Sequence, residues 1–182
     1  MLKVFLRLIL LICVLLAVVA GIGSLLPRQF SIEQQVDIDA AADVVFAKVN
    51  DLHYWMHWSP WRSEVLGGSA IQVGEPFAGS GAKMHWDDPR GEGKLWLTES
   101  EPSERIGYEF SAAGFREVRG EFRFVEISDG TQVTWTCRGR LPKGPFYGFF
   151  GFMFRGEMER QFQGSLQRLK SACESIEDGE EK

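Results

Sequence analysis

Apolar residues recur with a helical period near the C-terminus of the chain. On a helix at about 100° per residue, residues 149–174 collect a stripe of apolar side chains: Phe154, Met158, Phe162, Leu166, Leu169 and Cys173. The opposite side of this helix is polar and charged. A helix with one apolar face needs an apolar surface to lie on. We therefore predict a long amphipathic helix from about residue 149 to about residue 174, packed against another element.

The middle of the chain has the pattern of β-strands. Residues 30–38 are mostly apolar at alternate positions, which predicts a half-buried strand. Asp39 can then cap a short helix. Asn50 or Asp51 can cap a second short helix that runs to about His57. Six further strands are predicted between glycine-rich or Asp-Gly breaks, at residues 70–77, 82–87, 92–100, 105–112, 118–127 and 131–141.

Several of these strands have one apolar and one polar side. The strand at 118–127 places Phe122 and Phe124 on one side and charged residues on the other. This alternation is typical of an antiparallel sheet that is covered on one face only. The order of one strand, two short helices, six strands and one long helix predicts an α+β domain.

An apolar run precedes the predicted domain. Residues 4–26 contain one charge, Arg7, and are long enough to cross a bilayer as a helix. A cleaved signal peptide is the alternative, because residues 18–20 roughly fit a small-residue cleavage site. The run stays apolar through Leu26, which favours an uncleaved anchor.

The charges that flank this run predict its orientation. Lys3 and Arg7 come first, so the positive-inside rule predicts a cytoplasmic N-terminus and a domain on the periplasmic side, although Arg28 on the far side argues against it. The chain thus divides into three predicted parts: a transmembrane anchor or uncleaved signal at 1–27, a folded domain at 28–175 and an acidic tail at 176–182.

Charge and cysteine content narrow the classes of binding site. The whole chain has a net charge of −5, but residues 31–182 hold 17 basic and 25 acidic residues, a net charge of −8. Such an acidic domain without a basic stripe is not suited to nucleic acid. The three cysteines lack the spacing of a metal site. Cys137 and Cys173 are predicted to lie too far apart for a disulfide, so we expect free, buried thiols.

Three segments give the chain a family resemblance: V-D-I-D-A-A-A-D-V-V-F-A-K-V-N-D at 36–51, Y-W-M-H-W-S-P-W at 54–61, and G-T-Q-V-T-W-T-C-R-G at 130–139 before the long helix. Over residues 31–173 the chain resembles the START/Bet v 1-like superfamily, in its polyketide cyclase/dehydrase and lipid-transport branch. The resemblance implies a helix-grip fold, in which a curved antiparallel sheet of six or seven strands surrounds the C-terminal helix and an apolar cavity. It implies no shared catalytic residues, because members include lipid carriers, cyclases and co-chaperones.

Aromatic residues supply the candidate ligand-binding side chains. Trp55, Trp58 and Trp61 are three residues apart, so they either close one end of the core or gate a cavity mouth. The aromatic segment 146–154 begins the long helix and is interpreted as a lid, a surface that dips into lipid, or simple packing. The predicted cavity wall comprises Trp86, Trp96, Tyr108, Phe110, Phe122 and Trp135, with Phe154, Met158 and Phe162 from the helix.

The sequence leaves two features of this predicted wall undecided. Leu95 and Leu97 compete with Trp96 for the inner face, because a slip of one residue inverts a strand. Arg155 falls within the apolar stripe of the long helix, where it would meet an anionic head group or extend to solvent.

Sequence motifs for enzymatic chemistry are sparse. His53 and His57 lie four residues apart, and His85 could join them in a three-histidine zinc site, but no HExxH motif or nearby ligand supports it. There is no nucleophile elbow and no phosphate-binding glycine loop. We therefore expect no metal and no cofactor.

Three functions remain open on the sequence. The first is a membrane-tethered module that binds a hydrophobic small molecule or lipid in an internal cavity. The second is a cyclase- or lyase-type enzyme that uses cavity groups such as Tyr108, His85 or Arg155. The third is a co-chaperone-like module that binds a protein partner through the aromatic segment around Phe150.

Overall fold

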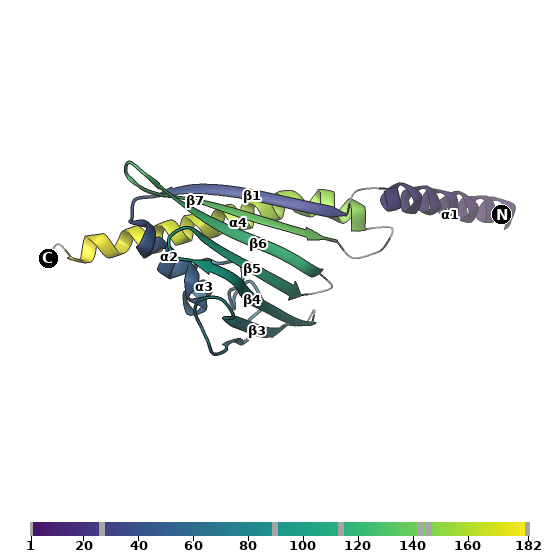
Figure 1. Cartoon of the computed structure of the whole chain (residues 1–182). Helices are drawn as coiled ribbons and strands as arrows, with labels where there is room; N and C mark the ends of the chain where they lie inside the picture. The colour runs from purple at the N-terminus through teal and green to yellow at the C-terminus, as the bar shows by residue number, and fades with distance from the viewer. Residues whose placement is uncertain are drawn as a thin grey trace.

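Seven antiparallel strands form one twisted sheet in the computed structural model of the chain (Figure 1). They are β1 (Gln29–Ile38), β2 (Ile71–Val73), β3 (Lys83–Asp88), β4 (Gly91–Glu101), β5 (Arg105–Ala112), β6 (Phe115–Ile127) and β7 (Gly130–Arg140). Their order across the sheet is β1-β7-β6-β5-β4-β3-β2, so the first strand lies at an edge beside the last. The structure describes residues 2–25, 28–88, 91–112, 115–141, 144 and 147–180, without the side chains of residues 2, 24, 25, 88, 116, 117, 148–154 and 176–180.

Three helices cover one face of this sheet, which we call the inner face. They are α2 (Ala42–Asn50), α3 (Leu52–Trp58) and α4 (Tyr147–Glu180), and α4 runs lengthwise behind the strands (Figure 1). The fourth helix, α1 (Leu2–Leu25), extends away from the domain. The α+β helix-grip architecture predicted from the sequence is therefore confirmed.

The ends of several elements differ from the prediction. The strand predicted at 70–77 is only Ile71–Val73, and Pro76 has no N–H to extend a ladder. The last helix starts at Tyr147 and continues to Glu180, into the segment predicted to be a tail. Asp39 does not cap α2, whose N-cap residue is Ala41 with no side-chain hydrogen bond. Asp51 does cap α3, since its Oδ1 accepts a hydrogen bond from the His53 N–H at 2.8 Å.

The strands alternate between the inner face and the opposite, outer face. Phe122 and Trp135 are fully buried on the inner face, as predicted. Trp96 was predicted to line this face, and this prediction is wrong. Leu95 and Leu97 are buried there instead, which leaves Trp96 half-buried on the outer face because side chains alternate along a strand.

The two ends of the sheet have different surroundings. At the end that we call distal, β6 and β7 join through a tight turn, and Gly130 has a φ of +125°. A Cβ on Gly130 would overlap the Ile38 carbonyl, so this turn needs glycine to lie against the end of β1. At the other end, which we call proximal, β1 begins four residues after α1 ends.

The distal end of α4 is held to the end of β1 by hydrogen bonds. The Asp39 N–H donates to Glu174 Oε1 at 2.9 Å. Lys170 Nζ lies 3.1 Å from the same oxygen and donates to the Asp37 carbonyl at 2.6 Å. The backbone hydrogen bond from Asp39, followed by that of Lys170, lowers the pKa of Glu174 below its usual value.

Glu174 is therefore expected to stabilise the fold in a pH-dependent way. A carboxyl whose pKa is lowered by folding contributes stability above its unfolded pKa of about 4.3 and loses it as the pH falls through the folded value. Because the group is near solvent, we expect Glu174→Gln to lower the free energy of unfolding by about 0.5–1 kcal/mol at neutral pH. Denaturant titrations at several pH values should show this difference shrink below about pH 4; a difference that persists unchanged in acid would contradict the assignment.

Candidate functional site

A cluster of aromatic rings fills the distal and central part of the inner face. Trp135 stacks on Phe162 of α4 with ring centroids 4.0 Å apart, and on Phe122 at 4.7 Å. Trp58 and Trp61 lie edge-on or tilted against Trp135 at 6.0 and 6.2 Å. These side chains were predicted to line a cavity, but here they pack against one another, so this part of the interior is core.

The tryptophans of α3 are positioned by the end of α2. Trp55 Nε1 donates to the Val49 carbonyl at 2.7 Å, and Trp58 Nε1 donates to the Lys48 carbonyl at 3.2 Å. These acceptors belong to the last turn of α2, where carbonyls lack partners within the helix. The two indoles thus satisfy a helix end and direct their rings into the core, which favours the packing interpretation of this segment.

A hydrogen bond joins Tyr108 and Trp135 inside the aromatic cluster. Trp135 Nε1 donates to the Tyr108 hydroxyl at 2.9 Å. Burial raises the pKa of Tyr108 well above its usual value and raises that of the Cys137 thiol to about 12. Both groups therefore stay protonated at neutral pH, which suits neither a general base nor a nucleophile.

The inner face becomes less buried toward the proximal end. Five apolar side chains at that end pack on the core but remain half-buried: Phe30, Phe110, Ala112, Phe115 and Met158. Phe30 is the second residue of β1, Phe115 begins β6 and Phe110 lies near the end of β5, so antiparallel pairing brings them to one end of the domain. We call this group the proximal mouth. It lies at the end of the domain from which α1 emerges (Figure 1).

Trp86 lies at the same end of the inner face. Its ring covers Gly93, where a Cβ would overlap the indole. Lys94 follows Gly93 on β4 and pairs with Ser111 of β5. Gly93, and the Trp86 ring that covers it, therefore lie at the level of Ala112, which belongs to the proximal mouth. Trp86 is 1% exposed, and within the described part of the chain its Nε1 has no hydrogen-bond acceptor. An unsatisfied buried donor of this kind is costly unless a further group satisfies it.

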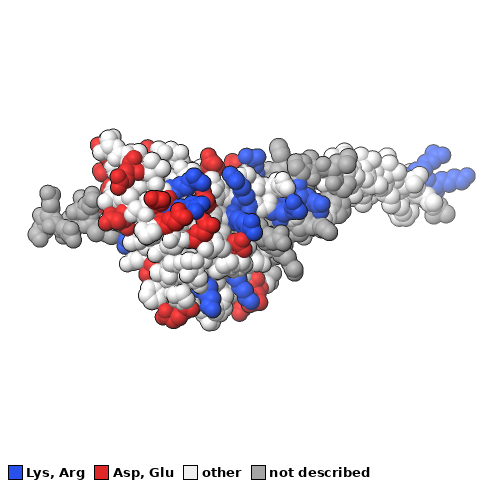
Figure 2. All heavy atoms as spheres, in the orientation of Figure 1, with Lys and Arg blue, Asp and Glu red and all other residues white. Residues whose placement is uncertain are grey.

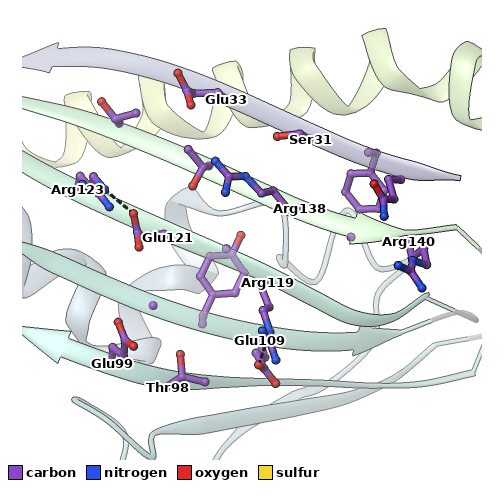
Figure 3. Close-up of a pocket in the computed structure, with 18 residues that line it drawn as sticks. Ser31, Glu33, Thr98, Glu99, Glu109, Arg119, Glu121, Arg123, Arg138 and Arg140 are labelled. Carbon is purple, nitrogen blue, oxygen red and sulfur yellow. Dashed lines mark hydrogen bonds and ion pairs between the residues drawn. The ribbon is translucent and has the colours of Figure 1, made fainter. Parts of the chain in front are cut away.

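The outer face of the sheet carries a broad polar groove of about 1150 Å³ (Figure 3). Its charged and hydroxyl side chains include Ser31, Glu33, Glu109, Arg119, Glu121, Arg123, Arg138 and Arg140. Arg119 pairs with Glu109 at 2.8 Å, and Arg123 pairs with Glu121. Arg138 and Arg140 form no ion pair with any described residue.

Several predicted site residues lie elsewhere. Arg155 is exposed and pairs with Glu159 at 2.9 Å, so it does not reach the interior; its exposure corrects its predicted role at a ligand. His85 lies exposed on the outer face of β3, and His53 pairs with Asp51. Among the described residues, no three histidine, cysteine or acidic side chains lie close enough to hold a metal.

The predicted aromatic lid is placed only in part. Phe146 lies outside the described residues, and Phe154 lies among residues 148–154, whose side chains are not described. Tyr147 is 40% exposed at the start of α4. The three cysteines are free, and Cys137 and Cys173 are buried, as predicted.

Sequence reasoning missed two features of this site. Phe30, Ala112 and Phe115 stand at strand ends, and only the pairing of the strands brings them together. The alternation along β7 indicates that the unpaired arginines at its end point outward. The sequence does not indicate which residues of β1 and β6 lie beside them.

Comparisons with known proteins agree with the fold. The sequence profile for polyketide cyclase/dehydrase and lipid transport matches residues 29–174. No curated protein sequence matches the chain. Among solved structures, CV1439 from Chromobacterium violaceum is 20% identical with a TM-score of 0.56, over 80% of this chain and 98% of that one.

Two other similar structures have informative descriptions. The di-domain ARO/CYC StfQ from the steffimycin biosynthetic pathway is 14% identical with a TM-score of 0.64, over 83% of this chain and 53% of StfQ. The Aha1 dimer from Colwellia psychrerythraea is 13% identical with a TM-score of 0.57, over 79% of this chain and 96% of Aha1. At these identities the likeness shows a shared fold.

Proposed function

Because the chain belongs to the polyketide cyclase/dehydrase and lipid transport family, we propose that it is a membrane-anchored module that holds an apolar small molecule or lipid at its proximal mouth. The observation that supports this most is the placement of half-buried apolar side chains at the end of the domain that adjoins α1. A molecule bound there would exchange with the bilayer without crossing water.

The apolar helix α1 supports the membrane part of this proposal. Its stretch Lys3–Gly23 has the length and mean hydropathy of a membrane span, and its residues 3–18 are exposed. With Lys3 and Arg7 at its start, the proposed orientation places the N-terminus in the cytoplasm and the domain on the periplasmic side. A membrane-impermeant thiol reagent should then modify Ser128→Cys in intact cells; modification only after permeabilisation would reverse the orientation.

The chemistry of the mouth suggests what the ligand looks like. Phe110 and Phe115 offer apolar ring surface, and Trp86 offers a buried N–H donor with no described acceptor. A molecule with an apolar body and one hydrogen-bond acceptor, such as a carbonyl or ester oxygen, matches both. The raised pKa of Tyr108 and the exposed positions of His85 and Arg155 give no support to a catalytic role for these three groups.

Native mass spectrometry of the full-length protein, extracted gently from its own membranes, tests the proposal. We expect a discrete additional mass that disappears on denaturation. Phe115→Ser should remove most of this mass, because it places a hydroxyl in the apolar mouth. Phe77→Ser is the matched control, since Phe77 is 40% exposed and lies beside His53 of α3, away from the mouth.

Two results would contradict the proposal. One is a bare protein mass in every mild detergent and in nanodiscs. The other is a bound mass that Phe115→Ser and Phe77→Ser reduce equally, which would place the ligand outside the mouth.

A further inference from the structure

The arginines of the outer face fall into a paired and an unpaired group. Arg119, which faces Arg138 across β6 and β7, belongs to the paired group because it contacts Glu109 at 2.8 Å. Arg105 and Arg123, toward the distal end, are neutralised: Arg105 pairs with Glu101 at 2.7 Å and with Glu99 at 3.3 Å, and Arg123 pairs with Glu121. Arg138 and Arg140, at the proximal end, are exposed and have no carboxylate partner among the described residues. Among the described arginines of this face, the two without a carboxylate partner therefore lie next to each other on β7, toward its proximal end.

The strand register fixes these free arginines close to the end of α1. Arg140 faces Gln29 and Arg138 faces Ser31 across the β1–β7 ladder. Arg28 joins them, because its carbonyl accepts a hydrogen bond from the Leu141 N–H at 2.7 Å. Gln29 follows Leu25 by four residues, at most about 14 Å of chain. We call Arg28, Arg138 and Arg140 the juxtamembrane arginine patch.

The rest of the domain has the opposite charge. Figure 2 shows acidic side chains gathered over one end of the sheet and basic side chains toward the end that adjoins α1. Residues 31–182 carry a net charge of −8. An anionic surface would therefore repel most of this domain and attract only its proximal end, which gives the domain one favoured orientation.

From these observations we infer that the juxtamembrane arginine patch binds the phosphate groups of anionic phospholipids in the bilayer that α1 crosses. Guanidinium groups form charge-assisted hydrogen bonds with phosphate oxygens. Arg138 and Arg140 project from the same face of one strand about 7 Å apart, and both are exposed where they line the open outer-face groove. This open arrangement suits a surface of headgroups rather than a single enclosed anion. The inference rests on the proposed membrane crossing by α1, and does not depend on a ligand in the mouth.

Docking of this kind has a consequence for the proximal mouth. Phe30 lies between Gln29 and Ser31, the residues that face Arg140 and Arg138. Any contact that holds these arginines at the headgroups therefore also holds the mouth at the bilayer surface. Without it, α1 alone would attach the domain to the bilayer.

The test uses the full chain in nanodiscs, with Cys13 replaced by serine and a fluorophore on Ser128→Cys in the distal turn. In the docked state the label lies roughly 33 Å from the proximal end of the domain, a distance equal to the length of β7. Time-resolved anisotropy, with energy transfer to acceptor lipids, reports the docked fraction. We expect a high docked fraction with about one third phosphatidylglycerol and a low one with phosphatidylcholine alone.

Arg138→Gln/Arg140→Gln should lower the ratio of docked to undocked protein roughly 25-fold, at about fivefold per arginine near an anionic surface. Arg105→Gln/Arg123→Gln is the matched control, with the same change of charge on the same face. It should retain docking. Salt near 1 M, where the Debye length is about 3 Å, should abolish docking of the unmodified chain.

Three results would overturn the inference: equal docking in the two lipid compositions, an equal loss in the control variant, or loss of docking on addition of inorganic phosphate at constant ionic strength. The last would identify free phosphate as the ligand of the patch. Phe115→Ser separates this inference from the proposed function, because it should leave docking unchanged while removing the mass bound at the mouth.

Discussion

Replacing Trp135 with alanine is expected to lower the free energy of unfolding by about 3–5 kcal/mol, since the substitution removes a large, fully buried ring. The ring stacks on Phe162 and Phe122, and its Nε1 donates to the Tyr108 hydroxyl. Losing it therefore removes the aromatic stack between the sheet and Phe162 of α4. For a domain of this size, the melting temperature should fall by about 8–15 °C.

Trp96→Ala is the matched control for this prediction. It removes the same side chain from the same sheet, but from the half-buried outer face. We expect a loss of no more than about 1.5 kcal/mol. Thermal melts of both full-length variants in one detergent compare them directly. Equal losses would mean that the stack between Trp135 and Phe162 does not hold the helix to the sheet.

Gly120→Ala is expected to lower the free energy of unfolding by about 3 kcal/mol. Tyr108 lies directly over Gly120 on the neighbouring strand, and a Cβ there would overlap its ring. The ring must move, and its hydroxyl then loses the hydrogen bond from Trp135. Denaturant titration of the full-length protein measures this loss.

Gly156→Ala in α4 provides the control. No atom outside the local backbone lies within 4 Å of a Cβ at Gly156, and the site is exposed. Alanine should therefore stabilise the helix by about 0.5–1 kcal/mol. A second check is the double variant Gly120→Ala/Tyr108→Ala, whose loss should be smaller than the sum of the two single losses. Additive losses would show that the Tyr108 ring does not cause the clash.

Most of the fold could be predicted from the sequence, because its patterns are local. The alternation along β6 and β7 identified the buried face, and the helical stripe through Phe162 and Leu169 identified α4. Errors occurred where local patterns compete. On β4, Leu95 and Trp96 are both apolar, so only packing against the rest of the core decides which one faces inward.

The candidate site was less predictable, for a physical reason. Aromatic composition alone cannot distinguish rings that line a cavity from rings that fill it; the difference depends on distances such as the 4.0 Å between Trp135 and Phe162. Similarly, a free arginine differs from a paired one only through its neighbours. Arg119 and Arg138 face each other across β6 and β7, yet only Arg119 reaches a carboxylate, on β5.

The position of β1 at the edge of the sheet determines when the sheet can be completed. Ile32 faces Cys137, which is synthesised 105 residues later, and β7 is the neighbour of β1 in the order of the described strands. At about 5–20 residues per second, β1 waits roughly 5–20 s for its partner. During that time strands β3 to β6, which are synthesised before β7, can already pair, and in the proposed membrane-anchored arrangement α1 keeps β1 next to the bilayer. The β1–β7 ladder is the strand pairing most distant in sequence, so we expect it to be the last strand pairing to form, before α4 packs against β1.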